Sequence, residues 1–217
     1  MDMDPNPGMK SCKQARSERT LRKILDATEV LLETRPFDGL SVQEITRKAG
    51  VATGCLHTRF ESKAAVLEIL FERYLADTER IAVAGTEESA WSDLPLEERI
   101  RGMCFLLVRT FRARRGVSRA AQVHYMRFPE LVSERMRKRM EAMYERIARV
   151  ILGDAEGIHH DDPLWAARFA LQTAVATCRA KILFHDHPVP DAAPAADRKL
   201  IDELTRLLLG YLSPRIP

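Results

Sequence analysis

The sequence predicts an all-α protein of about nine helices, and three observations support this prediction. Only 10 of the 217 residues are glycine, and 46% of the residues are hydrophobic, which is ample for a packed core. No stretch shows the alternation of β-branched residues that is typical of strands. Apolar residues recur instead at helical spacing in several long segments. The length fits one small domain followed by a larger helical domain.

The N-terminal segment differs from the rest of the chain. The first twelve residues contain two prolines and no apolar periodicity, and six cations accompany a single acid between Lys10 and Lys23. We expect residues 1–15 to form a disordered basic arm. Such an arm either follows a phosphate backbone or is an ordinary solvated tail, and both interpretations stay open. The segment has no apolar core of a signal peptide, and no run of 18 apolar residues occurs, so we expect a cytoplasmic bacterial protein with no membrane partner.

A two-helix motif starts at Ser41. Ser41 and Glu44 have the spacing of a capping box, in which each side chain pairs with a free backbone N–H at the helix start. Ile45 and Ala49 share one face of this helix. Gly50 follows the last apolar position, where a left-handed residue commonly ends a helix.

A second short helix is expected at about residues 53–60. Leu56 and Phe60 form its inner stripe, and the rest of its surface carries small and polar groups with one cation. Such a face suits the major groove of duplex DNA, where short hydrogen-bonding side chains read base edges. The positive end of the next helix and Lys63 are expected to hold a DNA phosphate. The expected DNA-binding residues are Ser41, Gln43, Thr53, Gly54, Cys55, His57, Thr58, Arg59 and Lys63.

The run from Leu21 to about Tyr74 resembles the DNA-binding domain of TetR-type transcriptional regulators. The matching features are the long first helix, the IT-x-x-AGV turn, the G-x-L-x-x-x-F recognition helix and the ESKAAVLEIL start of the fourth helix. The resemblance implies a homodimeric repressor that binds a palindromic operator and is released by a small-molecule effector. The family usually has a hydroxyl residue at Cys55, Tyr at His57, and His or Tyr at Arg59, and these side chains contact the DNA backbone. The thiol of Cys55 is a poorer donor, whereas Arg59 brings a full charge to a phosphate.

A larger domain is expected at residues 63–217, behind a helix-turn-helix domain at residues 16–62. Its last two helices, at about 164–185 and 195–212, carry more apolar surface than a terminal helix needs. Two such helices from each subunit can form a four-helix bundle about a two-fold axis, although the same residues also suit an intramolecular core. The expected dimer-interface residues are Ala166, Ala170, Ala174, Leu200, Leu204, Leu207, Leu208 and Tyr211.

The middle helices of this domain are expected to enclose an effector cavity, as the resemblance implies. An effector there would shift the protein between two states that differ in DNA affinity. Aromatic and Met side chains with one imidazole and one phenol suit an apolar ligand with few polar groups, although such residues are also ordinary core. The candidate lining residues are Met103, Phe105, Leu107, Phe111, His124, Tyr125, Met126, Phe128 and Cys178.

Other chemistries have less support in the sequence. It contains no phosphate loop, nucleophile elbow or helical zinc-hydrolase motif, so we expect no enzyme, no catalytic residue and no cofactor. The run His159–Asp162 is a poor metal site, because adjacent loop side chains seldom point at one ion. Two alternatives stay open: a ligand-independent DNA-organising protein, and a thiol redox sensor that acts through Cys55.

Overall fold

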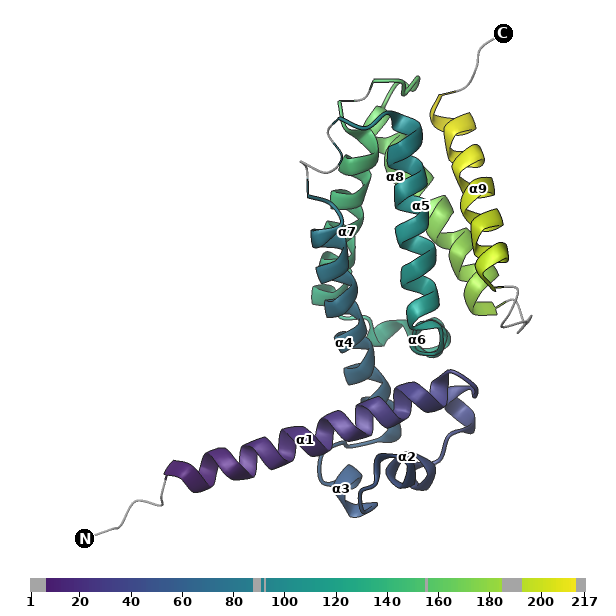
Figure 1. Ribbon diagram of the computed structural model, residues 1–217. Coiled ribbons are helices and arrows are strands. Elements are labelled where there is room, and N and C mark those ends of the chain that lie inside the picture. Colours follow the sequence, from purple (N-terminus) through teal and green to yellow (C-terminus); the bar gives the residue numbers. More distant parts are fainter. Residues whose placement is uncertain (1–6, 88–90, 92, 155, 185–192, 214–217) are drawn as a thin grey trace. The chain divides into compact units, whose positions relative to one another are not determined.

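The computed structural model describes residues 7–87, 91, 93–154, 156–184 and 193–213 (Figure 1). Nine α-helices lie in these ranges, which contain no β-strand, and the predicted all-α fold is therefore confirmed. None of the described helices is both long and apolar enough to cross a lipid bilayer. The chain forms two compact units: unit 1 comprises residues 1–74 and 116–122, and unit 2 comprises residues 75–115 and 123–217.

Unit 1 contains the N-terminal helices. Its elements are α1 (Pro7–Leu32), the 3-10 turn η1 (Phe37–Gly39), α2 (Val42–Ala49), α3 (Gly54–His57), the first half of α4 (Lys63–Ala84) and residues 116–122 of α6 (Arg115–Arg127). Its core includes Ile24, Leu32, Ile45, Leu56, Leu67, Leu70 and Val117, none of them more than 1% exposed. The helices α2 and α3 are too short to be stable alone, so this shared core holds them in place.

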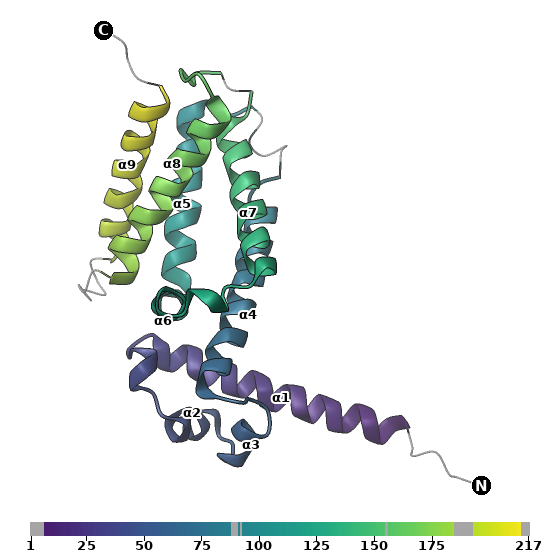
Figure 2. The ribbon, with the colours of Figure 1, turned by 180° about the vertical axis from the view of Figure 1, so that it is seen from behind.

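Unit 2 is a helical bundle. Its elements are the second half of α4, α5 (Leu96–Ala113), the turn η3 (Pro129–Leu131), α7 (Glu134–Leu152), α8 (Pro163–Cys178), the π-helical segment η4 (Arg179–Phe184) and α9 (Ala193–Leu212). The strongest packing pairs are α5 with α9 and α7 with α8, and α5, α8 and α9 lie side by side in Figures 1 and 2. Ile100, Ile151, Leu171, Ile182, Leu204 and Leu212 are among its fully buried side chains.

Helix starts in unit 2 follow ordinary capping chemistry. The Ser133 hydroxyl accepts the backbone N–H of Met136 at 3.1 Å and begins α7. The Asp162 carboxylate accepts the N–H of Trp165 at 3.0 Å, and Pro163 occupies the first helical position of α8. Both arrangements satisfy backbone donors that a helix start leaves without an intrahelical partner.

The expected disordered arm at residues 1–15 is partly wrong, because α1 begins at Pro7. Residues 1–6 lie outside the described residues. From Met9 to Leu32 the sequence contains neither Gly nor Pro, so nothing in it stops the helix before the turn that leads to η1. The cations of this segment are therefore carried on a helix.

The boundary between the units also differs from the expected division at residue 62. The structure places residues up to Tyr74 in unit 1, because Val66, Leu67 and Leu70 of α4 pack into the core of that unit. Residues 116–122 join unit 1 through Val117, although they lie far away in sequence.

The alanine stripe that was expected in a dimer interface faces the interior of unit 2. Ala166, Ala170 and Ala174 are at most 1% exposed, and they share a core cluster with Leu204 and Leu208. These five side chains are therefore not available to a partner chain. The helix α8 is apolar on several sides, so its sequence alone does not show which stripe meets the chain's own core.

Candidate nucleic-acid interface

The start of α2 is fixed by the predicted capping box. The Ser41 hydroxyl accepts the N–H of Glu44 at 3.2 Å, and the Glu44 carboxylate accepts the N–H of Ser41 at 2.9 Å. Arg35 forms an ion pair with Glu44 and also donates to the Gly39 carbonyl at 2.5 Å. The helix α2 therefore begins in a fixed direction relative to the turn before it.

Glu44 should make the stability of unit 1 depend on pH. The hydrogen bond from Arg35, with further bonds from Ser41, lowers the pKa of Glu44 from its ordinary 4.5 to about 2. A carboxylate with a lowered pKa in the folded state stabilises the fold above its unfolded pKa, and this contribution is lost as the pH falls. We expect the urea midpoint of unit 1 to fall between about pH 4.5 and pH 2. Glu44→Gln should flatten the profile in this window; an unchanged profile would contradict the assignment.

The turn between α2 and α3 is closed by a left-handed glycine. Gly50 has φ 65° and ψ 40°, which side-chain-bearing residues adopt only with strain. The next N–H, from Val51, returns to the Thr46 carbonyl at 3.0 Å. The Thr46 hydroxyl donates to the Val42 carbonyl at 3.0 Å and lies 3.3 Å from the Thr53 hydroxyl. These hydrogen bonds hold the turn in one conformation, and the contact with Thr46 of α2 positions the Thr53 side chain.

The helix α3 is shorter than the expected 53–60, since regular α-helix covers only Gly54–His57. Single hydrogen-bonded turns continue the chain to Phe60, whose N–H reaches the Leu56 carbonyl at 2.9 Å. Leu56 and Phe60 are 1% and 4% exposed, as expected of the inner stripe. With its apolar residues turned inward, α3 presents its small and polar residues outward.

The outward surface of α3 is open and polar. Gly54, His57 and Thr58 are exposed, and a Cβ added at Gly54 would meet no atom within 4 Å. The Arg59 guanidinium donates to the Cys55 carbonyl at 2.9 Å, and its Nε is buried without a hydrogen-bond partner among the described residues. The packing of unit 1 does not require a glycine at position 54. The exposed backbone there would allow another molecule to approach α3 closely.

Lys63 has a different role from the one expected. Its ammonium donates to the carbonyls of Phe37 at 3.1 Å, Asp38 at 3.4 Å and Leu40 at 2.9 Å, and it lies 4.7 Å from the centre of the Phe37 ring. An ammonium has three N–H donors, and these carbonyls take all three. The expected contact with a DNA phosphate would have to displace them.

Lys63→Met should therefore destabilise unit 1 by about 2 kcal/mol, because three carbonyls lose a charged donor. We expect the salt dependence of DNA binding to stay unchanged. Urea unfolding and titrations with DNA at several salt concentrations measure the two effects. Lys48→Met, at an exposed lysine of the same unit, is the matched control for the unfolding measurement. Unchanged stability together with a salt slope lowered by about one would restore the phosphate contact.

The N-terminal part of α2 offers further polar groups. Ser41 and Gln43 are exposed there, as the expected contacts require. Arg47 and Lys48, which were not among the expected contacts, are two exposed cations in the last turn of α2, just before the Gly50 turn. Their position next to the turn of the helix-turn-helix is the sequence signal that could have indicated them as candidate DNA contacts.

The expected effector-lining residues fall into separate groups. Met103, Leu107, Phe111 and Cys178 belong to the core cluster of unit 2. His124 lies 5.4 Å from the Tyr125 ring and 5.3 Å from the Phe128 ring, in α6 and just after it, whereas the adjacent Met126 is largely exposed. Phe105 lines a groove between α5 and α9. The expectation that this set lines one effector cavity stays a prediction.

The cysteines of the core are poor candidates for redox chemistry. Burial raises the pKa of Cys104 to about 11 and that of Cys178 to about 12. The thiolate is the reactive form, so these thiols are held in their inert state. Cys55 is partly exposed on α3, and its proposed redox role stays a prediction. Among the described residues no group of three or more His, Cys, Asp or Glu is placed to hold a metal.

The capped α2, the Gly50 turn and the outward polar face of α3 define a helix-turn-helix DNA-binding domain. Residues 24–70 match the family model described as bacterial regulatory proteins, tetR family. This part of the chain is therefore similar to the tetR family.

The sequence relatives are regulators and a receptor. The chain is 30% identical to the HTH-type transcriptional regulator EthR of Mycobacterium tuberculosis over 115 residues, which cover 53% of this chain and 52% of EthR. It is 31% identical to the A-factor receptor protein of Streptomyces griseus over 67 residues, which cover 31% of this chain and 24% of the receptor. The matched part thus spans about half the length of EthR and about a quarter of the length of the A-factor receptor.

Solved structures match over a larger part of the chain. The fatty acid degradation regulator FadR of Bacillus halodurans aligns with a TM-score of 0.63 over 99% of this chain and 100% of FadR, at 15% identity. A transcriptional regulator of Aquifex aeolicus VF5 aligns with a TM-score of 0.55 over 87% of this chain and 99% of that protein, at 16% identity. At these identities the likeness concerns the fold alone.

Proposed function

We propose that this protein is a transcriptional regulator, a repressor that binds a palindromic operator as a homodimer and leaves it when a small-molecule effector binds. The observation that carries the proposal is the exposed polar face of α3, with the unhindered backbone of Gly54 at its start. The similarity to EthR, an HTH-type transcriptional regulator, supports the same class of activity. The A-factor receptor is a receptor by name, which favours control by a ligand.

The DNA contacts are divided between two kinds of side chain in this proposal. Gln43 and Thr53 reach base edges in the major groove, where their short polar groups can discriminate bases. Ser41, His57, Thr58 and Arg59 reach the phosphates and set the register of the protein on DNA. Cys55 borders this surface as a small side chain that allows close approach.

A homodimer is part of the proposal because one α3 reads only half of a palindromic operator. Two recognition helices have to reach major grooves about 34–36 Å apart on one face of DNA. We place the interface on the outer face of α8 and α9, a surface that we call the α8/α9 outer face. Its residues are Trp165, Phe169, Leu207 and Tyr211.

Aromatic stacking supports this placement. The rings of Trp165 and Phe169 are parallel within 9°, with centres 5.3 Å apart, and Phe169 lies 5.4 Å from the Tyr211 ring. Trp165, Phe169 and Leu207 are 51%, 44% and 53% exposed. Large apolar side chains gathered on one face are typical of a protein interface. Of the interface residues expected from the sequence, Leu207 and Tyr211 belong to this face.

Gly54→Ala tests the DNA-binding role of α3. The new methyl group meets open space inside unit 1, so we expect unchanged stability and a tenfold or greater loss of DNA affinity, on the order of 1.4 kcal/mol. The matched control is Gly39→Ala, also in unit 1, where the Cβ would lie at an ordinary 3.7 Å from the Pro36 side chain. Binding of a genomic duplex library measures the effect. Equal affinity for Gly54→Ala and wild type would remove α3 from the interface.

A further inference from the structure

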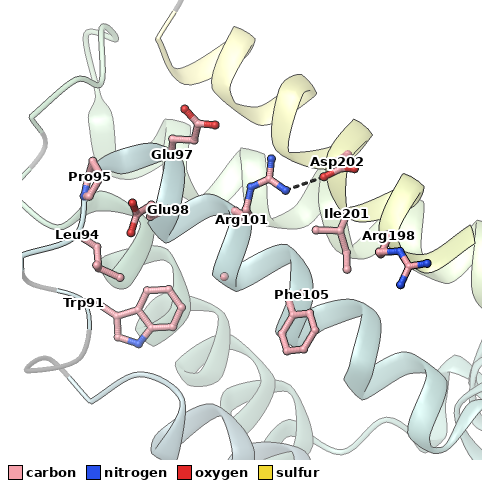
Figure 3. A pocket seen from close by; sticks show the side chains of 11 residues that line it. Trp91, Leu94, Pro95, Glu97, Glu98, Arg101, Phe105, Arg198, Ile201 and Asp202 are labelled. Carbon is pink, nitrogen blue, oxygen red and sulfur yellow. Dashed lines mark hydrogen bonds and ion pairs between the residues drawn. The ribbon is translucent and has the colours of Figure 1, made fainter. Parts of the chain in front are cut away.

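A groove in unit 2 opens between α5, α9 and the segment before α5 (Figure 3). Its volume is about 970 Å³, which is within the range of small-molecule sites. Its walls include Trp91, Glu98, Arg101, Phe105, Ile201 and Asp202. Of the residues predicted to line an effector cavity, only Phe105 lines this groove.

The indole of Trp91 is held in a fixed position at one end of the groove. Its Nε1–H donates to the Gly85 carbonyl at 2.7 Å. The ring lies directly against α5 at Gly102, where an added Cβ would come within 2.7 Å of the indole. The absence of a side chain at Gly102 therefore allows the Trp91 indole to pack directly on the backbone of α5. The indole is partly exposed and lines the groove.

The charges of the groove are unevenly distributed. Arg101 and Asp202 form an ion pair of 2.6 Å across the groove, and their charges largely cancel each other. The Glu98 carboxylate, in the first turn of α5, lies toward the end that holds Trp91, whereas the Glu97 carboxylate points away from Trp91 (Figure 3). Arg198 lies toward the opposite end, near Phe105. The Trp91 end is thus anionic and aromatic at once.

Phe105 supplies the second aromatic wall. It is 46% exposed, and the Arg109 guanidinium lies 5.6 Å from the centre of its ring. Ile201 adds an aliphatic surface from α9. The apolar part of a ligand that extends along α5 would therefore contact aromatic or aliphatic side chains at both ends of the groove. Removing these exposed side chains from water would contribute favourable binding free energy.

We propose that this groove binds an organic cation with an aromatic, apolar body. The positive charge lies beside the Trp91 indole and the Glu98 carboxylate, and the body extends toward Phe105 and Ile201. A fixed indole face attracts a cation through its ring quadrupole, and a neighbouring carboxylate adds direct charge attraction. The effector role of such a ligand rests on the proposed function, whereas its binding does not require DNA.

Tetraphenylphosphonium and tetraphenylborate form a matched pair of probes, because they share size and shape but carry opposite charges. Calorimetric titration of the full chain without DNA should give saturable binding of the phosphonium and at least tenfold weaker binding of the borate. In a Trp165→Phe background Trp91 is the sole tryptophan, so quenching of its emission reports on this groove alone. Equal affinity for the two probes, or no saturable binding of the phosphonium, would overturn the inference.

Charge removal at one residue separates the groove from general surface attraction. Glu98→Gln should weaken phosphonium binding about fivefold, since one partly solvated carboxylate is lost. Glu134→Gln, also an exposed acid in the first turn of a helix but outside the groove, should leave binding unchanged. Equal weakening by both substitutions would contradict the assignment of the groove.

The effector role has a separate readout. Phosphonium at saturation should lower the affinity of the wild-type protein for its DNA severalfold, and Glu98→Gln should shift this response to higher concentration. DNA affinity that does not respond to bound phosphonium would overturn the effector role. If the protein binds no DNA at all, the proposed function fails, while the titrations without DNA still decide whether the groove binds the cation.

Discussion

Gly116→Val should destabilise unit 1 by about 3 kcal/mol, because the side chain has no space to occupy. A Cβ at position 116 would lie 2.5 Å from both the carbonyl carbon and the oxygen of Leu32, and 2.8 Å from the backbone nitrogen of Glu33. These are backbone atoms at the end of α1, so no side-chain rotation relieves the clash. Residues 116–122 would have to move away from α1 and expose Val117 and the core around it.

Chemical unfolding of the full chain, followed by circular dichroism, measures this effect, and Gly39→Ala is again the control with an ordinary contact. Gly116→Ala should show the same direction with a smaller shift. DNA binding should weaken together with stability, because α2 and α3 share the disturbed core. A midpoint equal to that of the wild type for Gly116→Val would show that α6 does not approach α1 this closely in solution.

Phe169→Asp should convert the proposed homodimer into a monomer and weaken operator binding by more than about a hundredfold. The ring lies between Trp165 and Tyr211 on the α8/α9 outer face, so a carboxylate there would be buried against apolar rings of the partner. A monomer places only one α3 on DNA and loses the second half-site. The fold of unit 2 should survive, because Phe169 is outside its buried core.

Sedimentation and DNA titration on the same sample measure both consequences. Met126→Asp is the matched control, since Met126 is an apolar side chain of unit 2 that is 71% exposed and lies outside the α8/α9 outer face. It should leave both assembly and binding unchanged. A dimer of undiminished stability for Phe169→Asp would place the interface elsewhere.

The local features of the DNA-binding domain could be predicted from the sequence. The capping box of Ser41 and Glu44, the left-handed Gly50 and the buried pair Leu56 and Phe60 each depend on residues within one or two helical turns. Spacing alone specifies such features.

The features that the sequence did not reveal depend on distant contacts. Lys63 meets carbonyls 23 to 26 residues earlier, so a basic residue at a helix start is as consistent with this contact as with a phosphate. Ala166 and Phe169 both lie on an apolar helix, and only packing against α5, α7 and α9 shows which of them faces inward. The groove joins Trp91 to Ile201, residues that no local pattern connects.

Selection of bound duplexes from a random DNA library by the wild-type protein tests whether unit 1 reads duplex DNA. We predict enrichment of a two-fold symmetric sequence whose half-sites are centred about one helical turn apart, and loss of this enrichment with Gly54→Ala and with Phe169→Asp. A library that stays random after repeated selection with folded wild-type protein would contradict the claim that unit 1 reads duplex DNA.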